Sequence, residues 1–156
     1  LLKIKNYFSG EKKINLEVVD ILTNLSENFS VSELVDNCLA KNTIKTCKML
    51  NENIFSLEDC ILIIRTFLLK SKRILNIRIN FDESKNLDNE LRNYKPIIFW
   101  KDKEIVKNQI SSWNKSDIQK LIYKINKIEL LIKKNSENSL KILSDFILNT
   151  SKKVNN

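Results

Sequence analysis

Residues that form tight turns are scarce in this chain. One glycine, Gly10, and one proline, Pro96, occur in 156 residues. All-β sandwiches and barrels need many turns, which glycine and proline usually supply, so the composition argues against such folds. Hydrophobic residues make up 42% of the chain, enough to build a core. The length fits one domain, or one domain with a piece of another.

Histidine is absent. Its absence excludes Ser-His and Cys-His nucleophilic pairs and removes most zinc sites. The single glycine also excludes the glycine-rich loops that bind nucleotide phosphates. The carboxylates are scattered among lysines, as solvated surface charges usually are, and no pair is typical of acid–base catalysis. We therefore expect no catalytic, cofactor-binding or metal-binding residues, and no enzyme activity of this chain by itself.

Long hydrophobic runs are also absent. The longest, residues 60–64, is followed by Arg65 and Thr66 and resumes at residues 67–69. A membrane-spanning helix needs about 20 apolar residues, so we expect none. Charged residues make up 29% of the chain, which is typical of a soluble protein without a membrane partner.

The N-terminal residues 1–5, LLKIK, lack the ordered basic, apolar and small-residue regions of a signal peptide. Without a secretion signal, an odd number of cysteines indicates reduced thiols in the cytoplasm. Their spacing matches no metal motif, and we expect them to be small apolar core residues: Cys38, Cys47 and Cys60. The chain does not begin with Met, so we expect a processed product or a fragment.

Positive charge is concentrated in one part of the chain. The net charge is +8, and residues 95–134 hold ten lysines and four carboxylates, a net of +6. A localised basic surface attracts phosphate groups or an acidic protein. Alternatively, these lysines form a solvated face, which the lysine count alone favours.

Apolar residues recur at helical spacing through most of the chain, which predicts an all-α fold. Asn15, Asn42 and Asn114 are suitable helix caps, and Ser56 with Asp59 resembles a capping box. We expect one helix to begin at Ser30 or Ser32 and the next after Asn42, with these residues facing the core: Leu34, Val35, Cys38, Leu39, Ile44, Cys47, Leu50 and Ile54. In the last two helices they are Ile118, Leu121, Ile122, Ile125, Ile128, Leu131, Ile132, Leu140, Leu143, Phe146 and Ile147.

A long helix should begin after Ser56 and extend to about Ile79 as the buried centre of an antiparallel bundle. Arg65 interrupts its apolar run. The guanidinium lies either on the one wet side of the helix, which we favour, or in an ion pair with a neighbouring helix or subunit. Further along, Glu129 and Lys133 are spaced as a favourable i,i+4 pair.

The only proline opens the stretch KPIIFWKDK, residues 95–103. Pro96 cannot continue a helix, so residues 95–98 should be an extended lead-in to a helix that begins near Phe99 and ends at Trp113. We expect Ile97 and Ile98 to anchor this lead-in to the bundle.

Phe99 and Trp100 are adjacent and cannot both face the same core. We predict that Phe99 points inward and Trp100 outward, near three lysines. An exposed aromatic ring among lysines can stack on an unpaired base. The candidate nucleic-acid-binding residues are therefore Trp100, Lys101, Lys103 and Lys107. Alternatively, Trp100 packs under the linker or against another protein.

Several stretches, taken in order, resemble the delta subunit of bacterial DNA polymerase III, the clamp-loader subunit that opens the sliding clamp. They are INLEVVDIL at residues 14–22, SELVDNCLA at 32–40, ILIIRTF at 61–67, PIIFWK at 96–101, and Trp113 followed by the helix with Glu129 and Lys133. Their order and spacing together carry the resemblance, which covers most of the chain.

The resemblance implies that residues 1–29 end an AAA+ helical lid domain and residues 30–156 form a helical collar domain. Collars of this family pack side by side with other clamp-loader subunits near primer–template DNA. Arg65, Glu129 and Lys133 are then candidate subunit-interface or structural residues. Clamp binding is assigned to an upstream module that this sequence does not include. The delta subunit itself is not expected to hydrolyse ATP, although the whole assembly is a DNA-directed DNA polymerase, a nucleotidyltransferase.

A second hypothesis needs no clamp loader. The chain could instead be a free-standing helical adaptor whose basic face binds an acidic protein. The two hypotheses differ in their partners, because only the first requires the other clamp-loader subunits.

Overall fold

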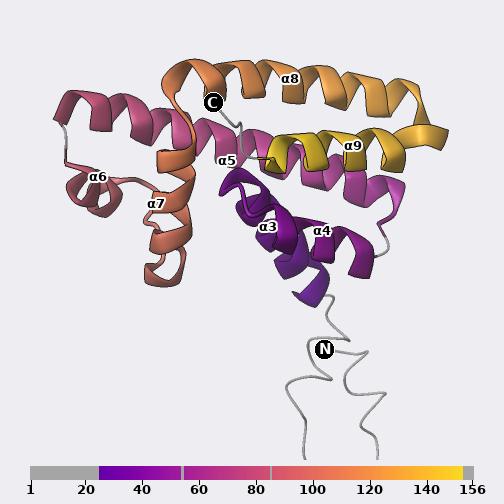
Figure 1. The fold of residues 1–156 in the computed structure, drawn as a ribbon, viewed down its shortest axis with the longest axis horizontal. Coiled ribbons are helices and arrows are strands. Elements are labelled where there is room, and N and C mark those ends of the chain that lie inside the picture. Colours follow the sequence, from indigo (N-terminus) through magenta and orange to yellow (C-terminus); the bar gives the residue numbers. More distant parts are fainter. Residues whose placement is uncertain (1–24, 54, 85, 153–156) are drawn as a thin grey trace, which may run out of the picture.

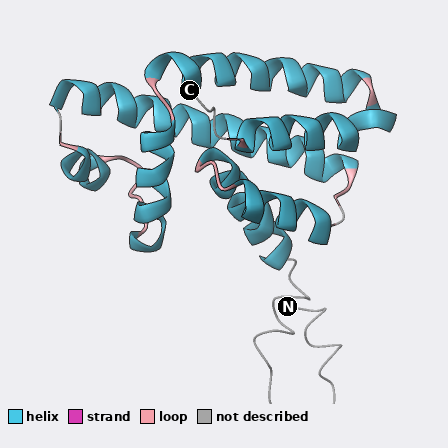
Figure 2. Ribbon diagram, viewed as in Figure 1, coloured by secondary structure: helices cyan, strands magenta, loops and turns pink. Residues whose placement is uncertain are grey.

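The computed structural model describes residues 25–53, 55–84 and 86–152. Helices are the only regular secondary structure in these residues, which confirms the all-α prediction (Figure 2). The α-helices are α3 (Leu25–Leu39), α4 (Thr43–Glu52), α5 (Leu57–Ser84), α6 (Leu87–Asn93), α7 (Lys103–Ser112), α8 (Lys115–Lys134) and α9 (Ser139–Ser151). Two short 3-10 helices are η1 (Trp100–Asp102) and η2 (Ser136–Asn138).

The expected lid remnant, residues 1–29, lies mostly outside the described residues, as do residue 54 and the last four residues. Helix α3 begins at Leu25 and continues through residues 29 and 30 without a break, so the expected division between residues 29 and 30 falls within a helix.

Helix starts are encoded locally, as the sequence predicted. The Asn42 side chain accepts a hydrogen bond from the amide of Lys45, and Asn114 accepts one of 2.8 Å from the amide of Asp117. The capping box before α5 is also present. The Ser56 amide donates to Asp59 Oδ2 at 2.7 Å, and the Asp59 amide donates to Ser56 Oγ at 3.2 Å. Each cap satisfies amides that a helix start leaves without intrahelical partners.

Helix α5 is the centre of the bundle. It has 28 residues and packs against α3, α6, α7, α8 and α9 (Figure 1). It continues about one turn beyond the predicted end at Ile79. Its fully buried apolar side chains include Cys60, Ile63, Ile64, Phe67, Ile74 and Ile77. No helix within the described ranges is long and apolar enough to cross a membrane.

Helices α8 and α9 complete the bundle on one side of α5. In Figure 1, α8 runs antiparallel to α5, and α9 returns beneath α8. The rings of Phe67 on α5 and Phe146 on α9 meet edge to face, with centroids 5.2 Å apart. Edge-to-face pairs add about 0.5–1.5 kcal/mol to the area that they bury. The core therefore lies between α5, α8 and α9, with α3 crossing its open side.

Three side chains that we expected to face the core are exposed: Ile44, Leu131 and Leu140. Helix α4 shows the reason. Its contact face is centred on Thr46, which is fully buried and whose hydroxyl donates to the Asn42 carbonyl at 2.8 Å. A threonine can face the core when its hydroxyl donates a hydrogen bond to a carbonyl of the preceding turn. With Thr46 facing inward, Ile44 two positions earlier faces solvent.

Candidate protein and nucleic-acid interface

The stretch between α6 and α7 takes an extended path over the bundle, as Pro96 predicted. The Lys95–Pro96 peptide bond is cis. Within residues 95–99, Ile98 alone is buried in the core, with 5% of its surface exposed, whereas Ile97 is 79% exposed. The prediction that both isoleucines are anchors was therefore right for Ile98 and wrong for Ile97.

Phe99 does not point inward. Both Phe99 and Trp100 are 75% exposed, so the prediction is wrong for Phe99 and confirmed for Trp100. The geometry of an extended chain explains the error, because successive side chains point to opposite sides. With Ile98 buried, Ile97 and Phe99 must both face outward. Trp100 then begins the 3-10 turn η1 and stays on the surface.

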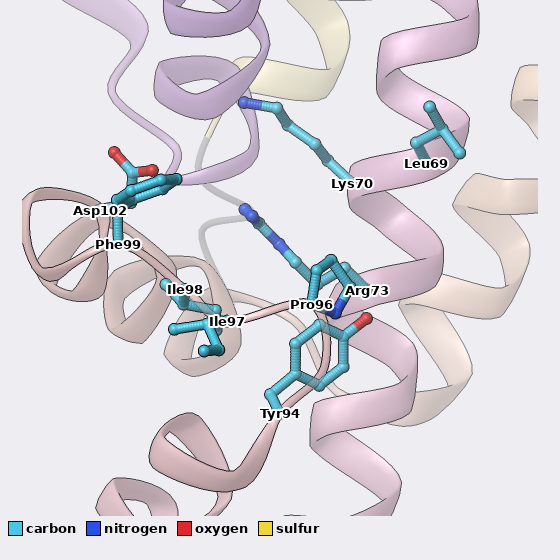
Figure 3. A pocket seen from close by; sticks show the side chains of 9 residues that line it. All are labelled: Leu69, Lys70, Arg73, Tyr94, Pro96, Ile97, Ile98, Phe99 and Asp102. Atoms are coloured by element: carbon cyan, nitrogen blue, oxygen red, sulfur yellow. The ribbon is translucent and has the colours of Figure 1, made fainter.

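A groove of about 380 Å³ lies beside these residues (Figure 3). Helix α5 contributes three of its lining residues, and the rest come from the extended stretch and η1. The lining residues are Leu69, Lys70, Arg73, Tyr94, Pro96, Ile97, Ile98, Phe99 and Asp102. Leu69 is 70% exposed, although it belongs to the apolar segment 67–69 that follows Arg65 and Thr66. Large apolar side chains therefore flank the groove and are left exposed within the described part of the chain.

A polar network joins three helices next to the groove. Asp36 on α3 forms an ion pair with Lys70 on α5, and Lys70 Nζ also donates to Ser32 Oγ at 2.7 Å. Arg73 Nη2 lies 3.6 Å from Asp36 Oδ1. Gln109 on α7, which is fully buried, donates from Nε2 to Asp36 Oδ1 at 2.9 Å. The Asp36 carboxylate therefore pairs with the Lys70 and Arg73 cations and accepts a hydrogen bond from the Gln109 amide.

This network is structural in the first place. Burial lowers the pKa of Lys70 below its usual value, and the charge of Asp36 offsets part of that effect. The network ties α5, which lines one side of the groove, to α3 and α7, because Asp36, Lys70 and Gln109 lie on three different helices. The sequence carried no signal for it, since Asp36 and Lys70 are 34 residues apart.

The four candidate nucleic-acid-binding residues differ in their surroundings. The ammonium of Lys101 lies 5.4 Å from the centroid of the exposed Trp100 ring. Lys103 is half-buried at the start of α7. Lys107 is paired with two carboxylates, Asp88 at 2.9 Å and Glu104 at 3.7 Å. The hydrogen bond to Asp88 raises the pKa of Lys107, which keeps the ammonium protonated. The negative charge of Asp88 offsets much of the positive charge that Lys107 would present to a ligand.

Arg65, Glu129 and Lys133 form one cluster between α5 and α8. Arg65 lies on the exposed side of α5, and its Nε is 3.9 Å from Glu129 Oε1. Lys133 Nζ is 2.6 Å from the same oxygen, which confirms the i,i+4 pair. Both interpretations of Arg65 thus hold together, because its side chain faces solvent and pairs with a neighbouring helix. Glu129 is 19% exposed, but Arg65 and Lys133 are 63% and 48% exposed, so solvent screens both pairs and each contributes about 1 kcal/mol or less.

No metal site is evident: in residues 25–53, 55–84 and 86–152, Cys, Asp and Glu side chains nowhere gather in threes that could hold an ion. Comparisons with protein-family models, curated proteins and solved structures found no match for this chain. Any function of the groove, the exposed aromatic pair and the polar network must therefore be argued from the sequence and geometry of this chain.

Proposed function

We propose that this chain is the C-terminal, collar-forming part of a clamp-loader delta subunit of DNA polymerase III, acting in DNA replication in the cytoplasm. Its bundle packs beside the collars of the other loader subunits near primer–template DNA. The observation that carries this proposal is the exposed apolar surface of Leu69, Ile97, Phe99 and Trp100, beside the groove. A subunit that works in a ring needs such a docking surface, and an isolated domain does not.

The magnitude of this surface fits a contact that works together with others. Fully burying a large apolar side chain contributes about 1.5–3 kcal/mol, so four of them contribute about 6–12 kcal/mol. Association costs about 4–15 kcal/mol of lost freedom of motion. The docking surface alone therefore supports weak pairwise binding at best. A ring, in which each collar touches two neighbours, adds the contacts that stable assembly requires.

The burial of the residues that resemble the delta-subunit family also supports the proposal. In SELVDNCLA and ILIIRTF, the apolar positions Leu34 and Val35 on α3 and Ile63, Ile64 and Phe67 on α5 are buried. These positions are the ones that a helical domain of this type must fill with apolar residues. Within PIIFWK, Ile98 is buried, whereas Ile97, Phe99 and Trp100 are exposed and left for a partner.

Trp100 and Lys101 are the part of this surface that we propose for DNA contact. The indole is exposed and a lysine lies beside it, which suits stacking on an unpaired base with a phosphate nearby. Lys103 lies one turn away at the start of α7. Lys107 contributes less, because Asp88 and Glu104 already hold its ammonium.

The test is binding of the purified chain to the remaining clamp-loader subunits, with variants of the docking surface. Ile97→Asp/Phe99→Asp places two charges in the docking surface and should abolish binding. Ile44→Asp is the matched control, because Ile44 is equally exposed on α4 and lies outside the docking surface. Far-UV circular dichroism checks that each variant is folded. Binding that survives Ile97→Asp/Phe99→Asp would refute docking through this surface.

The adaptor hypothesis has one observation in its favour, the net charge of +8. It predicts binding to an acidic protein without any loader subunit, with affinity that falls steeply as salt rises. Docking through apolar side chains predicts affinity that changes little with salt and is lost in Ile97→Asp/Phe99→Asp. A salt titration of whichever complex forms distinguishes the two functions.

A further inference from the structure

Helix α8 carries six lysines and two carboxylates, the most basic composition of any described helix. Its inner face is apolar and packs on α5 and α9 through Ile118, Leu121, Ile125 and Ile132. In Figure 1, α8 forms one edge of the bundle, on the other side of α5 from α6 and α7. Its outer face is therefore separate from the docking surface around Phe99 and Trp100.

The lysines of the outer face are aligned. Lys120, Lys124, Lys127 and Lys134 follow one another at intervals of four, three and seven residues, which keeps them on one side of a helix. All four are exposed. At 1.5 Å per residue the row is about 21 Å long, roughly six phosphate steps along one strand of a duplex.

Most of this charge has no counter-charge in the described part of the protein. Lys120 Nζ lies 3.6 Å from Asp117 Oδ1. The other carboxylate of α8, Glu129, forms its ion pair with Lys133, which is not part of the row. No described carboxylate lies within 4 Å of the ammonium groups of Lys124, Lys127 or Lys134. Neighbouring like charges on a helix repel one another. A row of this kind costs the free protein some stability, which a polyanion bound along it removes.

Tyr123 lies within the row and is 64% exposed. The Lys127 ammonium is 4.7 Å from the centroid of the Tyr123 ring. An accessible aromatic ring between lysines offers a base a stacking partner next to the charges that bind its phosphate. An acidic protein surface would also use the lysines, but only a nucleic acid adds unpaired bases that stack on the ring between them. The combination of a charged row and an aromatic ring favours nucleic acid over an acidic protein.

We infer that the outer face of α8, formed by Lys120, Tyr123, Lys124, Lys127 and Lys134, is a binding surface for the phosphodiester backbone of nucleic acid. We call this set the α8 stripe. The α8 stripe is distinct from the Trp100 contact proposed above, and it does not depend on the clamp-loader proposal, because the chain alone carries it. Its affinity comes from counterions released by the phosphates, and Tyr123 adds affinity for unpaired bases.

The experiment measures fluorescence anisotropy of a labelled 20-base-pair duplex and of a labelled 20-nucleotide thymidine strand with the full chain, at several salt concentrations. Four phosphate contacts predict a slope of log affinity against log salt of about −3.6 for the duplex and about −2.8 for the single strand. Duplex affinity should then fall about 150-fold between 50 and 200 mM salt, by the same relation.

The variant Lys124→Gln/Lys127→Gln/Lys134→Gln should reduce the duplex slope to about −0.9, so that the same salt change costs only three- to fourfold. Lys45→Gln/Lys48→Gln/Lys152→Gln is the matched control, because it removes the same charge from α4 and the end of α9. Tyr123→Leu should weaken binding of the single strand more than that of the duplex. Trp100→Ala should leave the salt slope unchanged.

Three outcomes would overturn the inference. The first is no measurable binding to either probe at 50 mM salt. In the second, the control variant loses as much affinity and slope as the α8 variant, so that net charge alone is responsible. The third is competition by polyglutamate as effective as that by an oligonucleotide of equal charge, which would assign the surface to acidic proteins. Loss of DNA binding in the α8 variant, with loader binding retained, separates this inference from the proposed function.

Discussion

The network around Asp36 gives the most quantitative prediction. Its carboxylate is 13% exposed, and the paired Lys70 side chain is 14% exposed. Arg73, the second cation, is 21% exposed. Removing a carboxylate from such a site leaves two cations that water cannot fully solvate, and the charge of Asp102 offsets only part of the loss at Lys70. The cost of that change is large compared with the loss of a surface ion pair.

The perturbation is Asp36→Asn, which keeps the shape of the side chain and removes its charge. Breaking a buried ion pair by removing one partner costs about 3–5 kcal/mol. Because these side chains keep some contact with water, we expect a loss near the lower end, about 3 kcal/mol. The control is Glu33→Gln on the same helix. Glu33 pairs with Lys45 at 2.6 Å, but the two side chains are 52% and 49% exposed, so that its loss should cost about 0–1 kcal/mol.

The assay is urea unfolding followed by circular dichroism, which gives the free energy of unfolding of each variant. The single variant Lys70→Met and the double variant Asp36→Asn/Lys70→Met complete the comparison. If each charge is costly without its partner, the double variant should be more stable than either single variant, because neither member of the ion pair is left unpaired. The reasoning would be refuted by equal losses in Asp36→Asn and Glu33→Gln, or by losses that simply add in the double variant.

Three further predictions concern stability and reactivity. Trp113→Phe removes a buried 2.7 Å hydrogen bond from the indole to a carbonyl of α3, and urea unfolding should show a loss of about 1–3 kcal/mol; a loss near zero would contradict the contact. In native protein only Cys47 should react with a thiol reagent, because Cys38 and Cys60 are buried and burial raises their pKa; three thiols should react in urea. Because burial lowers the pKa of Lys70, the unfolded chain holds that proton more tightly. The stability of the wild type relative to Lys70→Met should therefore rise as pH increases from the lowered pKa towards 10.5, and a gap that stays constant with pH would contradict it.

Local signals allowed much of the fold to be predicted. The caps at Asn42 and Asn114 and the capping box at Ser56 depend on residues three positions apart, so the sequence contains all that they need. The long central helix followed from apolar periodicity. Periodicity states which residues share a face. It does not state how far the face extends, and Leu69 and Leu140 lie at its margins in the structure.

The candidate interface was harder to predict. Adjacency requires Phe99 and Trp100 to point in different directions, but it does not decide which of the four apolar residues after Pro96 enters the core. That choice depends on where the extended stretch crosses α5, and Ile98 is the residue that fits. The pairing of Lys107 with Asp88 was also hidden, because it joins side chains that only the fold of α6 against α7 brings together.

We propose that this chain is a collar that assembles with clamp-loader subunits. The most direct test is size-exclusion chromatography with light scattering of the chain mixed with the other loader subunits of its organism. The proposal predicts co-elution in an oligomer with a mass equal to that of the loader with this chain included. Elution of the chain as a separate monomer, at concentrations where the other subunits assemble, would contradict it.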